Sequence, residues 1–169
     1  QRVGKRAIPH EHSVPGVPAT NGIAEAMVRR TIRGIRQNLV QAGLPRAYWT
    51  RACQHHWMAR NIAVQESDGK CPWERRHGES FIGIGLPFGC LIDYIPSPIS
   101  SNKNEKMDPT TKVGVFLGYV IQPGHKWNGE YIVAPLAAFK NCDLRIDATP
   151  GTCNVNVDTV TRIIPQDEI

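Results

Sequence analysis

The sequence predicts an α+β protein in which a helical hairpin precedes a small antiparallel β domain. Residues 20–43 repeat apolar side chains with helical periodicity, and residues 87–164 contain four short runs of strand-forming residues separated by turns. Helices do not alternate with these runs, as a parallel βαβ sheet would require. With 169 residues, 41% of them hydrophobic and 21% charged, the chain has the composition of one folded domain or two small ones.

The first expected helix covers residues 20–43. Thr20 or Asn21 suits the N-cap, and Gly43 followed by Pro45 ends the helix. Five apolar side chains fall within about 40° of one direction on a helical wheel, which is typical of an amphipathic helix. We expect this apolar stripe to pack on a core; its members are Ala24, Val28, Ile32, Ile35 and Leu39.

A second helix is expected from Pro45, which suits a first-turn position, to about Asn61. Its large aromatic residues favour packing between helices over stacking on bases. The four expected strands follow at residues 87–96, 112–121, 129–139 and 154–164. Because turn signals separate them, they suggest a small antiparallel barrel or sandwich.

These patterns divide the chain into four expected segments. They are an irregular basic arm (1–19), the helices (20–64), a linker (65–85), and the β domain with its C-terminal strand (86–169). The chain opens without Met or an apolar leader, so we expect it to be a piece of a longer protein. Its longest apolar stretch is interrupted by Pro135 and falls well short of the ~20 residues of a membrane span.

The positive charge of the chain is concentrated in its first third. Residues 1–60 contain ten Lys or Arg and two acids, whereas residues 61–169 contain ten bases and thirteen acids. This asymmetry points to a polyanionic partner for the first segment. The candidate phosphate contacts are Arg29, Arg30, Arg33 and Arg36 on the first helix, with Arg2, Lys5 and Arg6 on the arm. The alternative is an ordinary solvated helix face.

Other candidate sites are weaker. Lys126 and Trp127, beside Gly124 and Gly129, form either a basic aromatic tip that stacks on a base or a tight turn with a packed indole. The five cysteines are odd in number, widely spaced and without a Cys-x-x-Cys pair, which argues against a disulfide framework and a zinc knuckle.

Five short motifs, in order along the chain, resemble those of copia-type retrotransposon integrases. VPATNGIAEA resembles T-P-x-x-N-G-V-A-E-R, GLPRAYW resembles G-L-P-x-x-F-W, and CPWERRHG is similar to T-P-Y-E-L-x-x-G. PFGC and GVFLGY are similar to V-F-G-C and C-I-F-L-G-Y. The segment PGHKWNGEYIVAPL is also similar to integrase fragments of dinoflagellate genomes. The resemblance runs from about residue 13 to about residue 134.

The resemblance implies the last helices of an RNase-H-like catalytic core followed by an SH3-like barrel. Glu25 aligns with the third catalytic carboxylate, which in the complete DDE-type enzyme binds Mg²⁺ for two-metal phosphoryl transfer. The other two acids are aspartates upstream in the family, and this chain has no Asp before Asp68. Ala26 also replaces an arginine of the family motif. We therefore expect the chain alone to bind no Mg²⁺ tightly and to be inactive as an enzyme.

The implied partners are DNA, the missing N-terminal part of the catalytic core and other integrase subunits, in the nucleus. No membrane partner is expected. Two alternatives stay open. The fragment is either a packing or protein-interaction module, or an inactive relic. For Glu25, the alternative to an ancestral catalytic role is a surface ion pair with Arg29, four residues later on the helix. It is also open whether the hairpin folds without the missing sheet.

Overall fold

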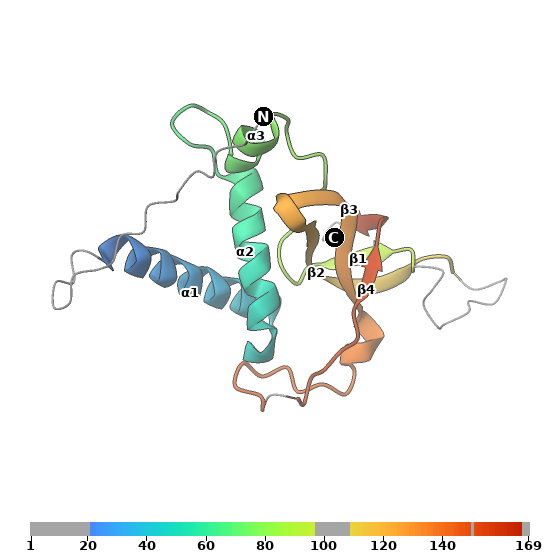
Figure 1. Ribbon diagram of the computed structural model, residues 1–169. Coiled ribbons are helices and arrows are strands. Elements are labelled where there is room, and N and C mark those ends of the chain that lie inside the picture. Colours follow the sequence, from blue (N-terminus) through green and yellow to red (C-terminus); the bar gives the residue numbers. More distant parts are fainter. Residues whose placement is uncertain (1–20, 97–108, 150, 167–169) are drawn as a thin grey trace, which may run out of the picture.

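The protein is α+β, as predicted, with helices at its N-terminal end and a five-stranded antiparallel sheet after them (Figure 1). The computed structural model describes residues 21–96, 109–149 and 151–166. The predicted basic arm and most of the loop before residue 112 lie outside the described residues. None of the helices in the described part is long and apolar enough to cross a membrane.

Helix α1 (Gly22–Ala42) has the bounds that its sequence predicts. Asn21 occupies the N-cap position, although its side chain makes no capping hydrogen bond. Gly43 ends the helix in the left-handed conformation, with φ of 62°, which a residue without Cβ adopts at little cost. The backbone N–H of Leu44 then donates to the carbonyl of Leu39 at 3.1 Å and closes the turn.

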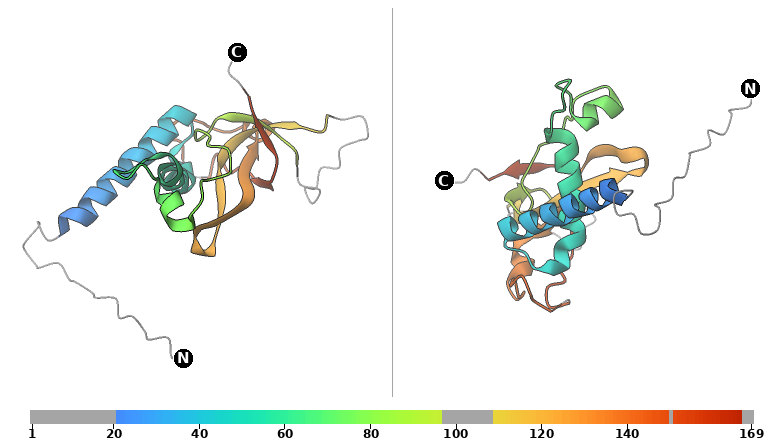
Figure 2. Two further views of the ribbon diagram at one scale, coloured as in Figure 1. Left: turned by 90° about the horizontal axis from the view of Figure 1, so that it is seen from above. Right: turned by 90° about the vertical axis from the view of Figure 1, so that its left-hand side faces the viewer.

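Helix α2 (Trp49–Ala63) begins later than predicted. Pro45 has an extended backbone with ψ of 163°, so it precedes the helix rather than forming its first turn. A short 3₁₀ turn, η2 (Arg46–Tyr48), comes between them. Instead of a hairpin of parallel axes, α1 and α2 cross at a steep angle (Figure 1; Figure 2, right).

A third helix, α3 (Pro72–His77), lies inside the segment predicted as a linker. The backbone N–H of Cys71 donates to the carboxylate of Glu74 at 3.1 Å, and Gly78 ends the helix in the left-handed conformation. Arg75 forms ion pairs with Glu66 and Asp68, which join the preceding loop to the helix.

The sheet has the strand order β4-β3-β2-β1-β5, with all neighbours antiparallel. Its long central pair is formed by β2 and β3, and two register shifts interrupt their ladder. The predicted third strand ends at Pro135 and continues as a 3₁₀ turn, η4 (Leu136–Phe139). The strands are β1 (Leu91–Tyr94), β2 (Lys112–Gln122), β3 (Lys126–Pro135), β4 (Asp158–Val160) and β5 (Ile163–Pro165).

The sheet is not a closed barrel, so this part of the prediction is wrong. The expected last strand is two short strands, β4 and β5, which pair with opposite edges and have no ladder between them in the described part. Only Thr161 and Arg162 separate them, so the Cα atoms of Val160 and Ile163 lie at most roughly 11 Å apart. The sheet must therefore curl until its two edges approach one another.

Six consecutive residues of the central strand β2, 114–119, are buried. Because alternate residues of a strand point to opposite sides of the sheet, both faces of β2 are covered. Val115 and Leu117 join a cluster with residues from the helices, whereas Phe116 and Tyr119 join a second cluster on the other side. The helical residues of the first cluster are Leu39, Tyr48 and Ala52. Helices and sheet thus share a hydrophobic core.

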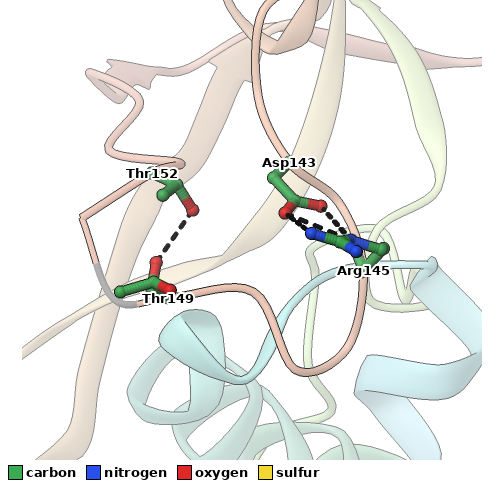
Figure 3. Close-up of polar contacts among 4 residues, drawn as sticks. All are labelled: Asp143, Arg145, Thr149 and Thr152. Carbon is green, nitrogen blue, oxygen red and sulfur yellow. Dashed lines mark hydrogen bonds and ion pairs between the residues drawn. The ribbon is translucent and has the colours of Figure 1, made fainter.

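The chain between η4 and β4 is stabilised by short-range polar contacts (Figure 3). The guanidinium of Arg145 forks onto the Asp143 carboxylate, with its shortest N–O distance at 2.7 Å, and the Thr152 hydroxyl donates to the carbonyl of Thr149 at 2.8 Å. This segment also contacts η2, because the backbone N–H of Arg46 donates to the carbonyl of Ile146 at 3.2 Å.

Candidate nucleic-acid interface on helix α1

Helix α1 contacts α2 through residues in the C-terminal half of α1. Gly34 lies against His56, and the Asn38 amide donates to the carbonyl of Ala52 at 3.0 Å. The first half of α1 extends beyond α2 and away from the sheet (Figure 1; Figure 2, left). Because the crossing is steep, residues 21–30 are all exposed.

The four arginines predicted to contact phosphate are exposed on α1. At 100° per residue, Arg29, Arg33 and Arg36 lie opposite the side of α1 that meets α2. Among the described residues, none of the four arginines belongs to an ion pair. Their positive charges are therefore not neutralised by the parts of the protein that the structure describes.

Glu25 lies exposed in the first turn of α1. Within the described residues it makes no ion pair, so the surface pair with Arg29 that the sequence suggested is not formed. An acid at this position interacts favourably with the positive end of the helix dipole, which gives Glu25 a local structural effect.

The acids in the described ranges do not form a Mg²⁺ site around Glu25. A two-metal site needs several hard oxygen ligands on convergent side chains. No group of three or more His, Cys, Asp or Glu with metal-binding geometry occurs in the part of the chain that the structure describes. Glu25 offers one carboxylate, which is insufficient, and we derive no catalytic step through a metal.

The apolar stripe predicted to pack on a core is buried only at its C-terminal end. Leu39 is 4% exposed, whereas Val28 is 58% and Ile32 is 43% exposed. Ile23 and Met27, beside the stripe, are exposed as well. The prediction of a fully packed stripe is wrong for the described structure because the steep crossing leaves the first half of α1 without a neighbouring element.

Two adjacent histidines of α2 lie where the helices meet, and they are held differently. His55 is buried; its Nε2 lies 2.9 Å from the carbonyl of Leu86 and its Nδ1 lies 3.3 Å from the Asn38 amide. This pairing requires the neutral ring, with Nε2–H as donor and Nδ1 as acceptor. Burial lowers the pKa of His55, although the Leu86 carbonyl partly opposes that effect.

His56 is half-buried, and its Nε2 atom is covered without a hydrogen-bond partner among the described residues. Burial lowers the pKa of His56, and the positive charges of Arg60 and Arg30 lower it further. The sequence did not associate His56 and Arg60 with the arginines of α1, because these residues are on a separate helix.

Lys126 is exposed at the start of β3, and β3 lies on the other side of α2 from α1 (Figure 1). The neighbouring indole of Trp127 donates to the carbonyl of Glu130 at 2.9 Å. Its ring lies 4.7 Å from that of Phe81 and 5.3 Å from that of Tyr131, centroid to centroid. Trp127 is therefore a packed turn residue, and Lys126 is not brought together with the α1 arginines.

Comparison with known proteins gives one informative match. The chain is 45% identical over 47 residues to the retrovirus-related Pol polyprotein from transposon TNT 1-94 of Nicotiana tabacum. This similarity supports a retrotransposon origin for the chain. The matched region is 28% of this chain but only 4% of the tobacco polyprotein. No family model and no solved structure matches the chain.

Proposed function

We propose that this retrotransposon-derived chain is an integrase fragment that retains sequence-independent nucleic-acid binding. In this proposal α1 and α2 come from the end of an RNase-H-like catalytic core, and the sheet corresponds to an SH3-like domain. The order of the five sequence motifs and the match to a Pol polyprotein support this origin. Strands β4 and β5, which pair with both edges of a curled sheet, are compatible with a barrel-derived domain.

The observation that carries the proposed binding is the row of exposed arginines on α1, which form no ion pair within the described residues. Guanidinium groups bind phosphate oxygens, and such contacts depend on salt but not on base sequence. The helix extends away from the protein body, so a duplex can approach it without meeting the sheet (Figure 2, left). Lys126, together with Arg2, Lys5 and Arg6 outside the described residues, would add to the attraction.

Strand transfer belongs to the proposed parent enzyme and not to this chain. The parent would use Mg²⁺ held by Glu25 and two upstream aspartates, act in the nucleus and assemble as a multimer. These 169 residues contain no Asp before Asp68, and the function proposed for them is binding.

The proposed binding is tested by fluorescence anisotropy with labelled duplexes of unrelated sequence. At about 50 mM salt, replacing Arg29, Arg33 and Arg36 by glutamine should weaken binding by about tenfold or more. A control variant carries the same loss of charge in the second half of the chain, at Lys140, Arg145 and Arg162. If both variants bind alike, or if affinity follows base sequence, the proposed function is wrong.

A second candidate function is a protein-interaction module. The exposed apolar residues Val28 and Ile32, one turn apart on α1, favour it, because neighbouring exposed apolar side chains often mark a contact surface. A folded chain that binds no duplex at about 50 mM salt would favour this function over nucleic-acid binding.

A further inference from the structure

The crossing of α1 and α2 brings a histidine against a glycine. An ideal Cβ placed on Gly34 would lie 2.2 Å from ring atoms of His56, so only glycine allows the imidazole to pack here. The ring also makes an edge contact with Trp57, with centroids 5.4 Å apart. These contacts fix the position of His56 between the helices.

Two arginines flank this imidazole by helix geometry. Arg30 lies one turn before Gly34 on α1, and Arg60 lies one turn after His56 on α2, so each is on the same side of its helix as the contact residue. Arg30 is exposed and Arg60 is half-buried. Both are near enough for their charges to act on His56.

The charges around His56 are positive. The charges of Arg30 on α1 and of Arg60 on α2 both act on the ring, and the uncharged His55 precedes it on α2. No acid in the described ranges forms an ion pair with either arginine. Two arginines near one imidazole, with no acid paired to them in the described ranges, form a positively charged site that an oxyanion would neutralise.

We propose that Arg30, His56 and Arg60 form a binding site for one phosphate group at the crossing of α1 and α2. The phosphate oxygens accept hydrogen bonds from both guanidinium groups, and the negative charge of the phosphate acts on the imidazole of His56. The anion offsets the two positive charges, so the imidazole takes up one proton from solvent when the phosphate binds. The ligand is a nucleic-acid phosphodiester or a free tetrahedral oxyanion, and the former rests on the proposed function.

Duplex binding by the full chain provides the first arm of the test. Arg60→Gln should weaken binding by about threefold to tenfold, as expected for one lost phosphate contact. Arg51→Gln is the matched control, because Arg51 is also half-buried on α2 but nine residues away, on the opposite side of the helix. It should change affinity by less than about twofold. Thermal melts establish that both variants are folded.

The pH dependence of the same binding tests the role of His56. Affinity for duplex should rise by about fivefold or more from pH 7.5 to pH 5.5, since protonation of the ring is linked to binding. His56→Gln should remove most of this rise. Equal pH dependence in the parent chain and in His56→Gln would contradict the proton uptake.

A second arm uses sulfate, an oxyanion that does not titrate in this range. NMR titration of His56 in sulfate, against chloride at equal ionic strength, should raise its protonation midpoint by about one pH unit, or tenfold in relative affinity. Arg60→Gln should abolish this rise. A rise with sulfate but no duplex binding would support the phosphate site and reject the proposed function; no rise with either ligand would overturn the site.

Discussion

Gly34 on α1 is in direct contact with the imidazole of His56 on α2, and this contact sets how closely the two helices approach. The hydrogen bond from the Asn38 amide to the carbonyl of Ala52, one turn further along, holds the same crossing. The position of the α1 arginines relative to the protein body therefore depends on a residue without a side chain.

Gly34→Ala should lower the free energy of unfolding by about 1–3 kcal/mol, because the added methyl group would overlap the imidazole and force the helices apart. Urea unfolding measures the change. Gly22→Ala is the control, since a Cβ added there would meet no atom of the described residues within 4 Å, and it should be close to neutral. A Gly34→Ala protein as stable as the parent would show that the crossing is not closely packed.

The stability of the protein should fall on acidification below about pH 6.5. His55 is held neutral by its two hydrogen bonds, and burial lowers its pKa, so the unfolded chain binds a proton that the folded chain does not. The stabilisation is complete above the ordinary histidine pKa and is lost as pH falls below it, by at most about 1.4 kcal/mol per pH unit for one group. Urea unfolding at several pH values tests this.

The pKa of His56 is lowered as well, so both histidines contribute to the pH dependence of the free energy of unfolding. The variant His56→Gln separates the two contributions. The variant should retain the part of the pH dependence that His55 causes. A free energy of unfolding that is constant between pH 5 and pH 7.5 in the variant would contradict the assignment to His55.

Two tyrosines of the sheet anchor the segment that follows α3. The hydroxyl of Tyr119 donates to the carbonyl of Ile84 at 2.9 Å and accepts from the N–H of Leu86 at 3.3 Å. The hydroxyl of Tyr131 accepts from the N–H of Ile84 at 3.1 Å. Burial raises the pKa of Tyr119 to about 12, so its hydroxyl stays protonated and able to donate.

Tyr119→Phe should cost about 1 kcal/mol and accelerate amide hydrogen exchange at Leu86 severalfold. Tyr94→Phe is the control, since it removes a hydroxyl that donates to Asp158 at 3.1 Å in another part of the sheet. Unchanged exchange at Leu86 in Tyr119→Phe would show that the phenol does not hold this segment.

The chain should bind Mg²⁺ weakly or not at all and should not join DNA strands. Glu25 is one exposed carboxylate, and the two upstream aspartates of copia-type integrases have no counterparts in these 169 residues. Calorimetric titration with Mg²⁺ and a strand-transfer assay check both parts. Mg²⁺-dependent strand transfer that disappears in Glu25→Gln would contradict the expectation of an inactive fragment.

Local patterns predicted local structure well. Gly43 with Pro45 marks the end of α1, and the strand-like run at 112–121 is β2 within one residue. Helix α3 was missed because a six-residue helix is too short to show a periodicity. The final run was predicted as one strand because alternation does not reveal that its two halves pair with opposite edges.

For the candidate site, the sequence predicted the positions of the arginines around helix α1 but not the contacts of this helix with other elements. Periodicity places Arg29, Arg33 and Arg36 on one side of α1, and they are exposed, but it cannot show whether another element covers the apolar side. Val28 is uncovered because of the angle at which α2 crosses, which depends on a tertiary contact at Gly34. For the same reason the sequence did not associate Arg60 with the α1 arginines.

The salt dependence of duplex binding tests the central claim most directly. Each phosphate that an arginine neutralises contributes about 0.9 to the slope of log K against log salt concentration. We predict a slope of about −3 or steeper for the parent chain, similar on duplexes of unrelated sequence, and a slope shallower by about 2 to 3 after replacement of Arg29, Arg33 and Arg36 by glutamine. A folded parent chain that binds no duplex, or a slope that these replacements leave unchanged, would contradict the claim.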